Sequence, residues 1–360
     1  MLAETLRSGK SRQRGRALDD WTVCKDSDAG TMPVVKNRRA MRRSYKLRLP
    51  MNRSPSKRFL RWITTVAFLL FLPAPAVPAS IMNVKLKPET VEAFNRYVQT
   101  TEARVDAEMK RPGESLYLDG LPEAQRSKIR GMLKSGQVYM QPLVTREATG
   151  EEITAPDALI HHWLGAVFIP GAKLGDVISV VQDYNHHQDF YKPEVVRSRL
   201  ISHEGNDFKI YYRLRKHQVI TVTLDTDHDV HYFPVDATHE YSRSISTRIQ
   251  EVANADEKNE YDKPVGKDGG FLWRMDSWWR FEESDGGVWV ECESVSLTRD
   301  IPTGLGWLIK PFVTSIPRAS LQMTMSSTRA AVLKRIARGE RPAPSSPPRT
   351  HRKARHTSAR

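Results

Sequence analysis

The stretch "WLGAVFIPGAKLGDVISVVQDYNHHQDFYKPEVVRSRLI", from Trp163 to Ile201, changes its pattern of apolar residues several times and sets the order of the elements around it. It begins inside an almost unbroken apolar run, which predicts a buried strand. The next part predicts a short helix, because apolar residues recur there at helical spacing: Leu174, Val177, Ile178 and Val181. "NHHQDFYKP" then predicts a second short helix or turn ended by Pro193, and "VVRSRLISH" predicts another strand.

Segments that alternate apolar and polar residues continue this pattern. They are "DFKIYYRL", "VITVTLD", "VHYFPVD", "YSRSISTRIQEV", "GGFLWRMDSWWRFEE" and "GVWVECESVSL". "EGND" (204–207) and "SDGG" (284–287) are typical of tight hairpin turns, and residues 254–270 are a long polar connection. Strands joined in series by hairpins predict one curved antiparallel sheet.

Helices are predicted on either side of this strand region. A long closing helix that ends near Gly339 is marked by apolar and small residues at helical spacing: Leu321, Met325, Thr328, Val332 and Ile336. Before the first strand, one helix starts at Pro88 and Glu89 and stops at "RPG" (111–113), and a second runs from Pro122 to about Leu133.

This order of elements resembles the helix-grip fold of the START-like (SRPBCC) superfamily, which includes polyketide cyclases/aromatases, lipid-transfer START domains and the birch-allergen group. Residues 163–201 and "PTGLGWLIKPFVTSIPRASLQMTMSSTRAAVL" (302–333) carry the resemblance, which covers about 160–337. It implies an α+β domain over 159–338, in which a curved antiparallel sheet wraps around a long C-terminal helix and leaves a cavity between them. Residues 80–158 are then expected to be an N-terminal extension with two helices packed on that domain.

The tryptophans of "GGFLWRMDSWWRFEE" (269–283) predict where this cavity lies. Alternate side chains of a strand face opposite sides. One set is large and apolar and is expected to face inward: Phe271, Trp273, Met275, Ser277, Trp279 and Phe281. The other set would face outward: Leu272, Arg274, Asp276, Trp278 and Arg280. The alternative, that these rings simply fill a core, stays open.

A ligand-binding wall is predicted from the following residues: Tyr212, Arg243, Trp273, Met275, Trp279, Trp307 and Phe312. Trp307 and Phe312 would form the mouth or lid of the cavity, or else plain packing. Arg243 would either touch an acidic group of the ligand or reach water at the rim of the sheet, because an unpaired buried charge is very costly. No catalytic residue is predicted.

The net charge of +14 lies at the two ends of the chain. Residues 1–79 hold 17 Lys/Arg against 5 Asp/Glu, and residues 341–360 hold 6 Lys/Arg and no acid. The body between them is slightly acidic, which argues against nucleic acid as a partner of the fold itself. The tail 339–360 is rich in Pro, Ser and Arg and predicts disorder, with contact to anionic surfaces as its possible use.

Residues 57–79 have the three parts of a secretory signal: a basic flank, a short apolar run from Trp62 to Leu72, and small residues before a cleavage point. The apolar run is too short to cross a membrane and is followed by prolines. Periplasmic or secreted localisation is therefore expected. Residues 1–56 would be a disordered basic segment, or would lie in part upstream of a true start at Met51.

Classical chemical motifs are weak or missing. Asp225, Asp227 and Asp229 resemble the start of a calcium loop, but the required glycine and closing Glu are missing, so no metal and no cofactor are predicted. His161/His162 would point apart on a strand, and His186/His187 would form a solvated cap. Cys292 is expected to be a small core residue, and no other cysteine follows residue 79 to pair with it.

The function predicted from these observations is an exported protein that binds an apolar or amphipathic small molecule, such as a lipid, an isoprenoid or a polyketide-like compound. Two alternatives stay open. One is an enzyme of the cyclase or hydrolase type in the same superfamily, which would need titratable groups inside the cavity. The other is an envelope scaffold whose basic tail touches anionic surfaces.

Overall fold

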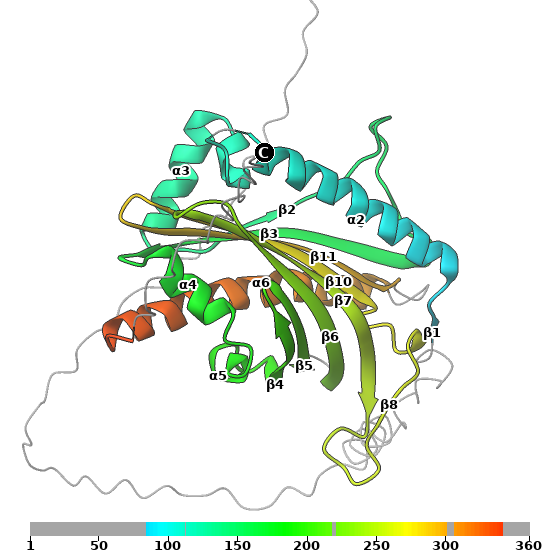
Figure 1. Cartoon of the computed structure of the whole chain (residues 1–360). Coiled ribbons are helices and arrows are strands. Elements are labelled where there is room, and N and C mark those ends of the chain that lie inside the picture. The colour runs from blue at the N-terminus through cyan, green and yellow to red at the C-terminus, as the bar shows by residue number, and fades with distance from the viewer. Residues whose placement is uncertain (1–83, 112, 218–220, 301–305, 341–360) are drawn as a thin grey trace, which may run out of the picture. The chain divides into compact units, whose positions relative to one another are not determined.

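The computed structural model describes residues 84–111, 113–217, 221–300 and 306–340, with side chains from residue 315 onward in the last range. The predicted signal (57–79), the basic segment 1–56 and the tail from 341 lie outside these residues. In the described part of the chain, nine strands form one antiparallel sheet in the order β2-β3-β11-β10-β7-β6-β5-β4, with β8 beside β7 (Figure 1). This sheet and the long helix α6 confirm the α+β helix-grip architecture expected from the sequence.

The elements follow the predicted order. The strands are β1 (Val84–Lys85), β2 (Tyr139–Pro142), β3 (Ala158–Pro170), β4 (Val195–Glu204), β5 (Asp207–His217), β6 (Thr221–Pro234), β7 (His239–Ala253), β8 (Tyr261–Asp262), β9 (Lys267–Asp268), β10 (Arg274–Ser284) and β11 (Gly287–Arg299). The helices are α2 (Pro88–Met109), the short 3-10 helix η2 (Tyr117–Gly120), α3 (Glu123–Lys134), α4 (Leu174–Val181), α5 (His187–Phe190) and α6 (Gly306–Ala337). The described helices include none that is both long enough and apolar enough to span a bilayer.

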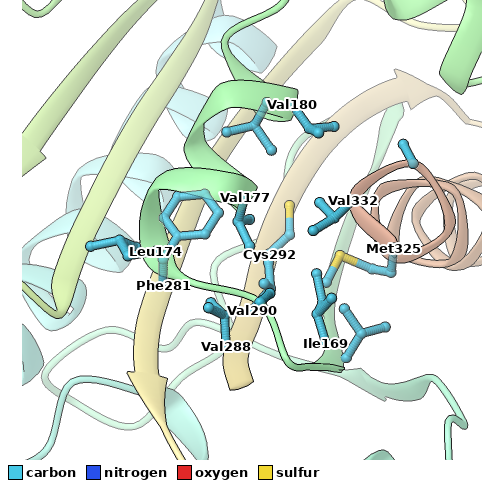
Figure 2. Packing of buried hydrophobic residues seen from close by; sticks show 14 of the residues in the cluster. Ile169, Leu174, Val177, Val180, Phe281, Val288, Val290, Cys292, Met325 and Val332 are labelled. Atoms are coloured by element: carbon cyan, nitrogen blue, oxygen red, sulfur yellow. The ribbon is translucent and has the colours of Figure 1, made fainter. Parts of the chain in front are cut away.

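The inner face of the sheet, defined as the face toward α6, carries the main apolar core. Figure 2 shows how Val290 of β11 and Phe281 of β10 pack with Val177 of α4 and Met325 of α6. Each such side chain contributes about 1.5–3 kcal/mol on burial. This core occupies the part of the inner face that lies under the second half of α6.

Gly165 sets how closely α6 crosses β3. A Cβ atom at this position would lie 2.9 Å from Cγ of Met325 and 3.1 Å from Cγ of Leu321, which is closer than side chains normally pack. A glycine is therefore required if the helix is to keep this distance from the strand. The contact fixes α6 on the sheet near the middle of the helix.

The opposite, outer face of the sheet is covered by the segment before β3. In Figure 1, α2 and α3 lie on the side of the sheet away from α6. Trp278 of β10 and Val295 of β11 pack against Phe94 and Val98 of α2, and Trp289 packs with Leu133 of α3. The predicted N-terminal helices are thus a covering layer.

This covering layer corrects the prediction for Trp273. Its ring lies on the outer side with the α2 residues and not on the inner face. Alternation holds only inside a strand, and β10 begins at Arg274, after the turn at Gly270, whose φ is +67°. Two of the three tryptophans, Trp273 and Trp278, therefore anchor the covering layer.

Buried charges also join α2 to the outer face. We call Arg104, Glu108, Arg280, Glu291 and Glu293 the outer-face ion cluster. Arg280, which is 2% exposed, bonds Glu108 of α2 at 2.7 Å and lies 3.4 Å from Glu291, and Arg104 of α2 pairs with both Glu108 and Glu293. The backbone N–H groups of η2 at Tyr117 and Leu118 donate to Glu291.

A chain of hydrogen bonds extends this cluster through His162. The N–H of Thr145 donates to the Tyr97 hydroxyl. The Tyr97 hydroxyl in turn donates to Nδ1 of His162, and Nε2 of the same ring donates to Glu293 at 2.7 Å. Burial raises the pKa of Glu293, but His162, Arg104 and Arg280 outweigh burial and lower it to about 2. The carboxylate is therefore charged: its Oε1 accepts hydrogen bonds from His162 and Arg104, while its Oε2 makes no hydrogen bond and lies 3.6 Å from Arg280.

The substitution Arg280→Met tests the importance of the outer-face ion cluster. It should lower the free energy of unfolding by about 3–5 kcal/mol, because it leaves buried carboxylates without their cation. Chemical denaturation measures the change. The control is Lys209→Met, which breaks the exposed pair between Lys209 and Asp229 and should cost about 0.5 kcal/mol or less. Equal, small losses in both variants would contradict this account of the cluster.

Candidate functional site

The candidate site lies on the inner face beside the apolar core, with which it shares Val230, Tyr232 and Cys292. Antiparallel pairing places inward side chains of β3, β11, β10, β7 and β6 in rows across the sheet. The first row is His161, Ser296, Met275, Ser246 and His228. The second row is Trp163, Ser294, Ser277, Ser244 and Val230. The third row is Gly165, Cys292, Trp279, Ser242 and Tyr232. We call these three rows the inner lining.

Several residues of the inner lining stay partly accessible although they face a helix. Trp163, Ser294, Ser277 and Ser244 form most of the second row, and all four are only half-buried. Trp163 lies under Arg318 of α6, whose guanidinium carbon is 6.0 Å from the centre of the indole ring. The second row therefore combines an aromatic face with hydroxyls in a position that a small molecule could reach.

Two histidines end the first row, and both are neutral. Burial lowers the pKa of His161 and of His228 to about 4. The Thr298 hydroxyl donates to the Arg299 carbonyl, so His161 must donate from Nε2 to Thr298, at 2.9 Å. His228 donates to Thr226 at 3.1 Å in the same way, since that hydroxyl donates to the Tyr212 carbonyl. Each ring keeps Nδ1 as an acceptor.

Tyr212 faces inward as predicted, but its hydroxyl is already engaged. It lies 2.8 Å from Nδ1 of His187, and Nε2 of that ring donates to the Val180 carbonyl. The two rings stack with their centres 5.8 Å apart. Burial raises the pKa of Tyr212 well above its usual value. The pair forms a fixed wall between β5 and α5, and His187 is buried where a solvated cap was expected.

The other predicted wall residues fall into three groups. Met275 and Trp279 lie on the inner lining, half-buried. Arg243 pairs across the sheet with Trp278, so it lies on the outer face, where it forms an ion pair with Glu102 of α2. It neither enters the cavity nor stands free at the rim, because α2 covers that position. Trp307 and Phe312 have side chains outside the described residues.

The remaining predicted motifs serve packing and charge pairing. Asp225 is buried and is bound by Arg213 at 2.8 Å through two nitrogens, while Asp227 pairs with Arg248 and Asp229 with Lys209. No group of three or more metal-ligating side chains occurs among the described residues. Cys292 is buried in the apolar core, and burial raises the pKa of its thiol well above the usual value.

A hollow lies on the outer side of the sheet, between α3 and the end of β10. Its volume is about 730 Å³, and charged side chains line most of it. Those charges are paired within the groove: Arg130 with Asp119, Arg126 with Glu123, and Lys134 with nearby Asp285. It is therefore a less suitable binding site than the inner lining.

The serines of the inner lining are the site residues that sequence reasoning missed. They alternate with other residues in "SRSIS" (242–246) and "ESVS" (293–296). Serines at alternate positions of a strand place their hydroxyls on one face of a sheet. This alternation of serines is the sequence signal that could identify them. The prediction of the cavity wall instead rests on large apolar residues such as the tryptophans.

No family model matches this chain, and no curated protein sequence does either. Solved structures with a similar fold include a STAR-related lipid transfer protein from Xanthomonas axonopodis, at 18% identity and TM-score 0.33, covering 52% of this chain and 98% of that one. Human STARD10 is 11% identical, with a TM-score of 0.34, and the match covers 61% of this chain and 83% of STARD10. The Zhui aromatase/cyclase from Streptomyces sp. R1128 is 12% identical, with a TM-score of 0.31, and the match covers 49% of this chain and 96% of that enzyme.

These neighbours come from the groups that the sequence resemblance named, and the likeness is one of fold. The identities are low and the TM-scores are below 0.5. The strand order and the position of α6 in this chain carry the helix-grip assignment by themselves.

The neutral histidines predict how stability changes with pH. Their pKa values are lower in the folded than in the unfolded chain, where the pKa of histidine is near 6.5. The unfolded chain therefore binds more protons between about pH 6.5 and 4, and these groups make stability fall as the pH falls through that window. Glu291 and Asp276 act in the opposite sense, because burial raises their pKa values to about 7 and about 6.

The substitution His228→Gln isolates the histidine contribution. Relative to the unsubstituted chain, the free energy of unfolding of the variant should decline less steeply from pH 6.5 to 4, by at most about 1.4 kcal/mol per pH unit. Urea denaturation at several pH values measures the slope. His161→Gln should have the same effect, and unchanged slopes in both variants would show that the rings are not neutral in the folded protein.

Proposed function

We propose that this protein binds an apolar or amphipathic small molecule against the inner lining, between the sheet and the first half of α6. The observation that carries the proposal is the second row of the lining, where an indole ring and three hydroxyls stay half-buried while the neighbouring core is fully packed. Binding sites for small molecules combine a mostly apolar wall with a few fixed polar groups. Lipid, isoprenoid and polyketide-like compounds all meet that description.

Binding is favoured over catalysis by the chemistry of the inner lining. Acid–base catalysis needs a titratable group poised near the working pH. The two histidines of the lining have pKa values near 4 and a threonine partner each, and the fifteen lining positions hold no Asp, Glu, Lys or Arg. The described residues therefore support a carrier or receptor more than a cyclase or hydrolase.

We further propose that the protein is exported and is cut after the apolar run that begins at Trp62. The basic flank, short apolar run and small residues of 57–79 support this, and the basic tail 341–360 would then be available to anionic envelope surfaces. Expression in the native host followed by N-terminal sequencing tests it. A mature N-terminus near residue 80 is expected, and a mature chain that retains residues 57–72 would contradict export by this signal.

Ligand binding can be tested with the neutral apolar dye Nile red and with native mass spectrometry of the full chain. The unsubstituted protein should bind the dye or carry a copurified molecule. Ser277→Phe should lower dye affinity about tenfold or more, because the ring fills the centre of the second row. The matched control is Ser326→Phe on the exposed side of α6, which should leave affinity unchanged. An unsubstituted protein that binds neither dye nor any copurified molecule would contradict the proposed function.

A further inference from the structure

The inner lining is free of formal charge, although the same strands are rich in charge on their other face. β11 places Glu291, Glu293 and Val295 outward, and Cys292, Ser294 and Ser296 inward. β10 likewise places Arg280 outward and Trp279 inward. The ionised side chains of these strands thus lie on the outer face of the sheet, and the candidate site lies on the inner face.

Charged groups on the elements around the lining are engaged elsewhere or lie at its edge. In the described part of α6, Arg335 pairs with Asp183, and Arg329 donates to the Phe168 carbonyl. Arg318 is exposed above Trp163. Glu240 lies beyond the third row, beside Phe281, and burial raises its pKa to about 7. Among the described residues, Arg318 is near only the Trp163 end of the second row, so an ionised ligand group placed elsewhere in the three rows would lose water without gaining an opposite charge from them, which is strongly unfavourable.

The lining nevertheless offers more hydrogen-bonding capacity than the protein itself uses. Ser242 is 2% exposed and Ser296 is 6% exposed, and neither hydroxyl bonds to another described residue. Ser244, Ser277 and Ser294 also lack a partner among the described residues. None of these hydroxyl oxygens is among the fully buried side-chain atoms that lack a partner, so each remains accessible enough to bind a polar guest. A guest that covered them without accepting or donating a hydrogen bond would leave them unpaired, which is costly.

We propose, on the basis of the proposed function, that the ligand is an uncharged molecule with oxygen atoms along its apolar body, such as an alcohol, ketone or ester, and that the serine hydroxyls of β7, β10 and β11 select it. Ionised carboxylates and phosphates would be discriminated against inside the three rows. Plain hydrocarbons would bind weakly, because they would leave the hydroxyls dry and unpaired.

The test compares four ligands that share one 18-carbon chain, as competitors of Nile red on the full-length protein at pH 8. They are 1-oleoylglycerol, which is neutral and oxygen-rich; oleate, an anion; oleoyl lysophosphatidate, which has a phosphate; and octadecene, which has no oxygen. The expected result is that 1-oleoylglycerol binds about tenfold or more tightly than each of the others, which corresponds to one or two hydrogen bonds of ordinary strength.

Ser242→Ala and Ser296→Ala supply the matched variants. Each should weaken 1-oleoylglycerol binding about 3- to 10-fold and leave octadecene binding unchanged, with no loss of folding stability, since each hydroxyl is unpartnered in the free protein. Ser326→Ala on the exposed side of α6 is the control. Oleate or lysophosphatidate binding as tightly as 1-oleoylglycerol would overturn the claim of a neutral ligand, and equal binding of octadecene would overturn the role of the hydroxyls. Both outcomes leave the proposed function standing, whereas failure of all four ligands and of Nile red would overturn it as well.

Discussion

The close crossing of α6 over β3 at Gly165 is the contact on which the arrangement of the inner face depends. It lets Leu321 and Met325 lie directly on the strand, so the second half of α6 and α4 can seal an apolar core. A helix packed on a twisted sheet cannot stay equally close along its whole length. Tight contact at one place is accompanied by a second row of the lining whose side chains are only half-buried.

Alternation along the strands then gives the two faces opposite electrostatic characters. The segment "VECESVS" puts each glutamate outward and each small neutral residue inward. The glutamates on the outer face are tolerable because Arg104 of α2, Arg280 of β10 and backbone N–H groups of η2 contact them. The same strand can therefore support a buried ion cluster on one side and a neutral lining on the other.

Sequence patterns were sufficient for the fold because they depend on local periodicity. The helix around Val177, the hairpins at 204–207 and 284–287, and the long helix containing Met325 all have clear apolar spacing or turn residues. The placement of single site residues depends on which elements cover each face of the sheet. Periodicity along one strand does not contain that information. Arg243 and Trp273 were assigned to the cavity because nothing local shows that α2 covers the outer face. Met275 and Trp279 face inward as expected because they lie inside β10, where alternation is regular, and their contact with a ligand stays a prediction.

The covering layer also shows that the sheet depends on the segment that precedes it. A domain cut at residue 158, as the helix-grip outline alone would suggest, would expose the rings of Trp278 and Trp289 and strip Glu293 of Arg104. β1 pairs with β9, so even the residues just before α2 are hydrogen-bonded to the connection that precedes β10. The folding unit therefore includes the described residues from Val84 onward, and in this chain the segment before the sheet is a structural part of the domain and not an appendage to it.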